Sequence, residues 1–83
     1  MNTPLRILIL CTGNSARSQM AEAIINRRGR DRIVAESAGS DPVARVNPWA
    51  IEALADAGIA WRGHAPRGID NVEPHAWDAV ITV

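Results

Sequence analysis

Residues 7–23 of the chain read ILILCTGNSARSQMAEA, and this stretch decides the fold. A short aliphatic run stops at Cys11, passes through small and polar residues, and resumes at Arg17 with helical periodicity. Because a continuous aliphatic run is typical of a strand that is covered on both faces, we predict a strand over 5–10 and a helix over 18–28. The apolar stripe expected on this helix consists of Met20, Ala21, Ile24 and Ile25.

The rest of the chain continues the alternation of strands and helices. A second strand is expected at 33–37, a second helix opens with Asn-Pro at 47–48, and a third strand follows at 79–83. This order predicts parallel pairing in a three-layer α/β/α fold, with residues 1–83 as a single domain. In such sheets, ligands bind at the carboxyl ends of strands, which is where Cys11 lies.

Composition limits the classes of function. The chain has 83 residues, of which 47% are hydrophobic and 22% charged, as in a globular domain. Nine basic residues balance nine acidic ones, so the overall charge does not favour nucleic acid or an anionic membrane as a partner. We expect a cytoplasmic protein, because the N-terminus lacks a secretory pattern and no apolar run could span a bilayer. The single cysteine excludes an internal disulfide and suits a reducing compartment.

The loop between Cys11 and Arg17 has the composition of an anion-binding turn. Gly13 and Asn14 tolerate positive φ, which would let successive N–H groups turn toward one centre, and the helix N-terminus adds free amides. Arg17 can offer a planar fork to a tetrahedral oxyanion, and the same field should stabilise a thiolate at Cys11, to which Ser18 can donate. A lone cysteine is more often a small buried hydrophobe, but the order strand, loop and helix favours a functional one.

The segment 11–22, CTGNSARSQMAE, resembles the signature of the low-molecular-weight protein tyrosine phosphatase superfamily, and in particular its arsenate reductase branch. Three further stretches agree with the resemblance, namely ESAGS at 36–40, ALADAGI at 53–59 and GHAPR at 63–67. The resemblance covers nearly the whole chain. It implies the fold of this family without its last strand and last helix, because the sequence stops at Val83.

The resemblance also implies roles for individual residues. Cys11 would be the nucleophile, Arg17 would bind the oxyanion and its transition state, and Ser18 would assist the sulfur. The oxyanion would be held by the loop residues Thr12, Gly13, Asn14, Ser15, Ala16 and Arg17. The loop would be supported by Asn14 in a left-handed conformation and by hydrogen bonds to it from Ser37 and His64. No metal ligand and no bound cofactor is implied.

Three functions remain open at this stage. The first is an arsenate reductase-like enzyme, in which Cys11 forms an adduct with arsenate and an external thiol, either thioredoxin or a small thiol, completes turnover. The external thiol is expected because this sequence has no second cysteine to resolve the adduct. Several reductases of the family carry a second cysteine where Ala16 stands here. The second is a phosphatase that acts on phosphotyrosine or an aryl phosphate, and the third is a catalytically impaired oxyanion-binding or regulatory module. Gln19 and Met20 favour the reductase branch, whereas the residues that discriminate best lie past Val83.

The C-terminal part of the sequence carries two further expectations. A helical turn is expected within 70–77, limited by Pro74, with His75 on the surface. If the protein is truly 83 residues long, the strand at 79–83 would present an unpaired apolar edge, so we would then expect a homo-oligomer.

Overall fold

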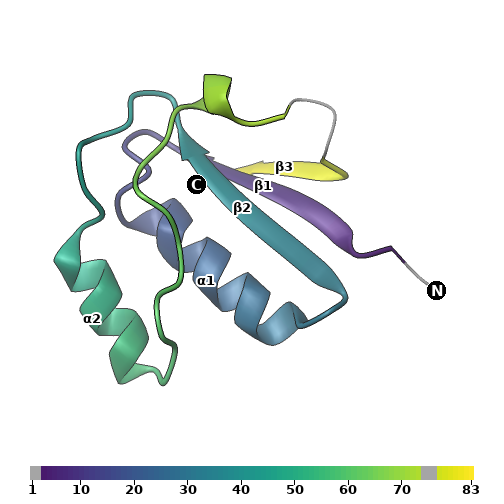
Figure 1. Cartoon of the computed structure of the whole chain (residues 1–83), viewed down its shortest axis with the longest axis horizontal. Coiled ribbons are helices and arrows are strands. Elements are labelled where there is room, and N and C mark those ends of the chain that lie inside the picture. Colours follow the sequence, from purple (N-terminus) through teal and green to yellow (C-terminus); the bar gives the residue numbers. More distant parts are fainter. Residues whose placement is uncertain (1–2, 74–76) are drawn as a thin grey trace.

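The computed structural model of the chain describes residues 3–73 and 77–83 (Figure 1). Its strands are β1 (Leu5–Cys11), β2 (Ile33–Gly39) and β3 (Ala79–Thr82). Its helices are α1 (Arg17–Gly29), α2 (Pro48–Asp56) and the short 3-10 helix η1 (Ile69–Asn71). The predicted alternation of strands and helices is confirmed. Pro74 and His75, on which two of the expectations depend, lie outside the described residues.

The three strands form one parallel sheet in the order β2-β1-β3, which confirms the predicted α/β class. In the register of the sheet, Cys11 at the end of β1 stands beside Gly39 at the end of β2. On the other side of β1, Leu10 stands beside Thr82 of β3. The last residue of the central strand is therefore the cysteine, and it lies at the carboxyl edge of the sheet.

The apolar core is small and centres on Ile7 and Ile9 of β1 and Ala35 of β2. Helix α1 packs across β2 and β1, with Ala21 and Ile25 against this core, and α2 packs on α1. The second helix begins as predicted, because the side chain of its N-cap residue accepts a hydrogen bond from the N–H two residues on.

The buried face of α1 differs from the predicted apolar stripe. Ile24, which the periodicity assigns to that stripe, is 38% exposed. The buried residues of the helix are instead Ser18, Gln19 and Glu22. The prediction is wrong here because, apart from Ala21, the inner face of the N-terminal half of α1 meets polar rather than aliphatic partners. Its buried side chains belong to a polar cluster whose members are Asn14, Ser18, Gln19, Glu22 and Ser37.

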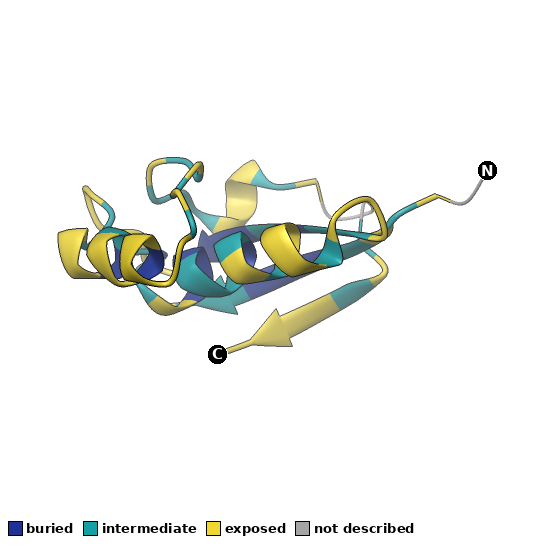
Figure 2. Ribbon diagram, turned by 90° about the horizontal axis from the view of Figure 1, so that it is seen from below, coloured by how far each residue is buried: buried dark blue, intermediate teal, exposed yellow. Residues whose placement is uncertain are grey.

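Strand β3 is the most exposed of the three strands, as Figure 2 shows. Val80, Ile81 and Val83 are each between 42% and 57% exposed. Among the described residues, no helix is both long and apolar enough to cross a membrane.

Candidate active site

The loop that joins β1 to α1 has its carbonyl groups and its amide groups in different environments. Four of the carbonyl oxygens accept hydrogen bonds from backbone N–H groups of the 40–47 segment. The pairs, donor first, are Ser40 with Cys11, Asp41 with Thr12, Val43 with Gly13, and Asn47 with Ser15. Within the described part of the chain, no acceptor faces the N–H groups of Gly13, Ser15, Ala16 and Arg17. The C=O and N–H of one trans peptide point in opposite directions, and the N–H groups of Gly13 and Ala16 share peptides with the carbonyls of Thr12 and Ser15. These two amides therefore point away from the 40–47 segment, toward the side where an anion could bind.

The sulfur of Cys11 is surrounded by hydrogen-bond donors. Its Sγ lies 2.8 Å from Ser18 Oγ, and the backbone N–H of Asn14 donates to it at 3.2 Å. Partial burial raises the pKa of this thiol. Hydrogen bonds from the Ser18 hydroxyl and from the N–H groups of Ser18 and Asn14, together with the charge of Arg17, outweigh that effect and leave the pKa below its ordinary value. The direction agrees with the prediction of a stabilised thiolate.

Asn14 organises the loop from inside the protein. It is fully buried, and its φ of 51° is the left-handed value expected for it. Its Nδ2 donates to Ser18 Oγ at 2.8 Å and to Ser37 Oγ at 2.9 Å. Because Ser18 Oγ accepts from Asn14, the hydroxyl hydrogen of Ser18 is free to point at the sulfur of Cys11. Gly13 was also expected to use positive φ, but within the loop only Asn14 does.

The expected direct hydrogen bond from His64 to Asn14 is absent from the described residues, and a chain of hydrogen bonds through Glu22 and Ser37 joins the two side chains instead. His64 Nε2 lies 3.0 Å from Glu22 Oε1, and Ser37 donates to the same oxygen at 2.8 Å. The buried carboxylate of Glu22 therefore stands between the imidazole and the loop. The imidazole of His64 is connected to Asn14 through Glu22 and Ser37. The bond between Ser37 and Asn14 runs from the amide to the hydroxyl, opposite to the direction expected.

Arg67 is a further contact of the loop that the sequence analysis did not identify. Its backbone N–H donates to Asn14 Oδ1 at 3.0 Å, and its Nε donates to the carbonyl of Ser37 at 3.0 Å. Its guanidinium also pairs with Glu36 at 2.6 Å. A polar residue recurring at helical spacing, Glu22 after Ser18, was a signal in the sequence for the cluster. No local signal pointed to Arg67, because its partners come from distant segments.

Arg17 is the first residue of α1 and is exposed. Within the described part of the chain, its guanidinium takes part in no hydrogen bond or ion pair. The N-cap residue Ala16 supplies no side-chain cap, and the first turn contains no acidic residue. A helix start without a cap leaves its N–H groups and its partial positive charge to an external anion.

A pocket of about 230 Å³ opens beside the sulfur. Its lining residues are Leu10, Cys11, Thr12, Ser40, Ile69, Thr82 and Val83. A group attached to an oxyanion bound in the loop could occupy this space. Among the described residues, no cluster of His, Cys, Asp or Glu is suited to hold a metal ion.

Comparisons with known proteins show the family and the fold. The family model described as low molecular weight phosphotyrosine protein phosphatase matches residues 6–83. The glutaredoxin arsenate reductase of Synechocystis is 33% identical over 78 residues, which are 94% of this chain and 59% of that protein. A solved structure of an arsenate reductase in the phosphate binding state has a TM-score of 0.88 at 33% identity, covering 95% of this chain and 60% of the other. A low molecular weight protein tyrosine phosphatase from T. tengcongensis has a TM-score of 0.84 at 30% identity, covering 94% and 57%. The chain thus spans somewhat less than two thirds of the length of these relatives.

Proposed function

Since the chain belongs to the low molecular weight phosphotyrosine protein phosphatase family, we propose that it acts as an arsenate reductase-like enzyme in which the 11–17 loop binds arsenate. The observation that carries the proposal is the position of the Cys11 sulfur. The sulfur lies next to unpaired loop amides, and Ser18 is placed to donate a hydrogen bond to it. The pKa of the Cys11 thiol is lowered. Two similar proteins are named arsenate reductases, one from Synechocystis and one of known structure. Their names favour arsenate as the oxyanion.

The first step of the proposed reaction is nucleophilic attack by the Cys11 thiolate on arsenic. A sulfur–arsenic bond forms, an arsenic–oxygen bond breaks, and the departing oxygen leaves as water after it has taken up protons. The loop amides and the guanidinium of Arg17 stabilise the negative charge on the remaining oxygens. Ser18 donates to the sulfur when it is a thiolate, both before the attack and if the sulfur leaves again.

We propose that the second step uses an external thiol, in keeping with the relative named glutaredoxin arsenate reductase; Cys11 is the single cysteine of these 83 residues. The thiol attacks the Cys11 sulfur, a disulfide forms, and the electron pair of the sulfur–arsenic bond goes to arsenic, which leaves as arsenite. A further thiol then reduces the mixed disulfide, so the two electrons come from two external thiols. We propose thioredoxin, glutaredoxin or a small thiol as the reductant, in keeping with the name of the Synechocystis relative. A reducing cytoplasmic location is part of this proposal.

A phosphatase is the second candidate. The family description and the T. tengcongensis structure support it, and so does the pocket beside Cys11, whose Leu10 and Ile69 offer apolar surface to an aryl group. In this reaction the thiolate would attack phosphorus, the alcohol would leave, and water would hydrolyse the phosphocysteine.

We also propose that a protein consisting of these 83 residues alone forms a homo-oligomer through β3. The proposal depends on the exposed apolar side chains of this edge strand, Val80, Ile81 and Val83. Nothing in the charge balance of the chain favours a nucleic acid or membrane partner instead.

The candidates are separated by measuring two products with one protein preparation. Arsenite is measured after incubation with arsenate, glutathione and glutaredoxin, and nitrophenol after incubation with para-nitrophenyl phosphate; Cys11→Ser is the control in both assays. Arsenite formation that depends on Cys11 supports the reductase, whereas nitrophenol alone supports the phosphatase. Protection of Cys11 from alkylation by phosphate, without turnover of either substrate, would mean that the chain is an oxyanion-binding module. The absence of all three results would refute oxyanion chemistry at this loop.

A further inference from the structure

Gln19 is a buried amide side chain at the start of α1 that none of the proposed chemical steps uses. It is 1% exposed. Its Nε2 donates to the carbonyl oxygen of His64 at 2.9 Å, to the carbonyl oxygen of Asn14 at 3.3 Å and, at 3.4 Å, to the side-chain Oδ1 of Asn14. Its Oε1 accepts from the indole N–H of Trp61 at 3.3 Å. The side chain therefore connects the anion loop to the segment that follows α2.

The carbonyl of Asn14 differs from the other carbonyls of the loop. Its neighbours on both sides, Gly13 and Ser15, place their carbonyl oxygens on backbone N–H groups of the 40–47 segment. Asn14 has left-handed φ and is fully buried, and its carbonyl oxygen receives its hydrogen bond from Gln19 instead. A buried carbonyl without a donor is unfavourable, so Gln19 stabilises the one peptide orientation in which this oxygen points into the protein.

The same peptide group carries the N–H of Ser15. In a planar trans peptide the C=O and the N–H point in opposite directions. When Gln19 holds the Asn14 oxygen inside the protein, the Ser15 N–H must point to the other side, where no acceptor lies within the described part of the chain. A reversed peptide would direct a carbonyl oxygen at a bound oxyanion and remove one of its donors.

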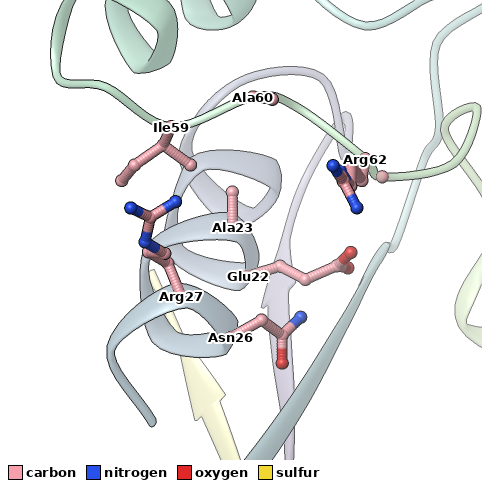
Figure 3. A pocket seen from close by; sticks show the side chains of 8 residues that line it. Glu22, Ala23, Asn26, Arg27, Ile59, Ala60 and Arg62 are labelled. Atoms are coloured by element: carbon pink, nitrogen blue, oxygen red, sulfur yellow. The ribbon is translucent and has the colours of Figure 1, made fainter. Parts of the chain in front are cut away.

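The orientation of the Gln19 amide is set by the segment over α1. Figure 3 shows the course of this segment past the helix, with Ile59, Ala60 and Arg62 above Glu22 and Ala23, around a pocket of about 290 Å³. From the same segment, Trp61 donates to Oε1, which leaves Nε2 to face the two carbonyl oxygens. Gly63 permits this close approach, because a Cβ at that position would lie 2.6 Å from both Gln19 Oε1 and Trp61 Nε1.

We propose that Gln19 is a positioning residue that fixes the Asn14–Ser15 peptide so that the Ser15 N–H points at the bound oxyanion, and that Trp61 fixes Gln19 in turn. This rests on the proposed function, in which the loop binds an oxyanion. Gln19 touches neither the oxyanion nor Cys11, and it acts through the backbone of the loop.

The test uses inorganic phosphate as the probe and four proteins: the parent, Gln19→Leu, Trp61→Phe and Asn26→Leu. Asn26 is the matched control, because it is also an amide side chain of α1 bonded to backbone, accepting from Ala35 N–H at 2.7 Å and donating to Ala35 O at 2.9 Å. Its removal lowers stability without touching the loop. Phosphate affinity is read from the slowing of Cys11 alkylation. The direction of the Ser15 N–H bond is read from residual dipolar couplings without phosphate, and the unfolding temperature is measured for each protein.

We expect Gln19→Leu to weaken phosphate binding by about tenfold or more, a typical loss when one oxyanion donor is misdirected. Trp61→Phe, which keeps the ring and loses only the indole N–H, should give a smaller loss in the same direction. Asn26→Leu should leave phosphate affinity within about twofold of the parent although its unfolding temperature falls. Unchanged Ser15 couplings in Gln19→Leu, or equal losses of affinity in Gln19→Leu and Asn26→Leu, would overturn the inference. If phosphate does not protect the parent, the proposed function fails, and the couplings alone still decide whether Gln19 orients the peptide.

Discussion

Gly39→Ala is expected to damage the anion loop from the neighbouring strand. A Cβ on Gly39 would lie 2.4 Å from the carbonyl oxygen of Thr12 and 3.0 Å from the backbone nitrogen of Asn14. Ordinary contacts begin near 3.4 Å, so one of the two backbones must move by roughly 1 Å. Gly39 is held in the register of β2 beside Cys11, and its N–H donates to Arg67 O at 2.9 Å. The loop is therefore the part that shifts.

A displacement of about 1 Å in a positioned binding group can reduce the corresponding rate or affinity about 100-fold, which is about 2.7 kcal/mol. The substitution should also lower the free energy of unfolding by about 1–3 kcal/mol, as overpacking does. Phosphate protection of Cys11 against iodoacetamide measures the first effect, and thermal unfolding measures the second. Gly68→Ala is the matched control, because Gly68 bridges to Gly39 but a Cβ on it would meet no atom closer than 3.7 Å. A Gly39→Ala protein that binds phosphate as tightly as the parent would refute the argument that this contact fixes the loop.

Three further predictions concern the sulfur, the guanidinium and the edge strand. The rate of Cys11 alkylation should reach its half-maximum below the pH of about 8.5 that is typical of a free thiol, and a midpoint at that pH would remove the basis for nucleophilic attack. Because folding lowers the pKa of this thiol, its stabilising contribution is complete above the unfolded pKa and is lost as the pH falls through the folded pKa. The free energy of unfolding of the parent relative to Cys11→Ser should therefore rise with pH across that window, and a flat difference in denaturant melts would contradict the sign. Arg17→Lys keeps the charge but loses the bidentate fork, so phosphate affinity by calorimetry should fall about tenfold or more; equal affinities would mean that Arg17 does not contact the oxyanion. Sedimentation over a range of concentrations should reveal dimers or larger species that dissociate when Ile81, exposed on β3, is replaced by Lys, and a monomer at every concentration would exclude pairing through that edge.

The parts of the fold that depend on neighbouring residues were predictable from the sequence. The aliphatic run of β1 and the Asn-Pro start of α2 follow from local preferences, and the structure confirms them. The left-handed Asn14, which the family resemblance implies, is confirmed as well. The contact between Asn14 and Ser37 was also expected, from the family resemblance, although its donor and acceptor are reversed.

The contacts that were mispredicted depend on tertiary packing. The periodicity of α1 identifies which residues share a face, but it cannot tell whether that face meets aliphatic or polar partners. Ile24 was therefore placed on the inside and Glu22 was overlooked. Once Glu22 is buried beside Ser37, its carboxylate takes the hydrogen bond of His64 that was expected to reach Asn14. Arg67 was overlooked for a related reason, since its partners lie on β2 and in the loop.

The polar cluster under the loop also bears on how stability changes with temperature. The exposure of apolar surface on unfolding raises the heat capacity, whereas the exposure of polar surface lowers it. After Ile9, the largest fully buried side chains in the described part of the chain are the amides of Gln19 and Asn14 and the hydroxyls of Ser18 and Ser37. The heat-capacity increment of unfolding should therefore fall below the usual value of about 12–15 cal/mol/K per residue. A small increment gives a shallow stability curve, so the loop would keep its geometry over a broad range of temperatures even though the total stability of so small a core is modest.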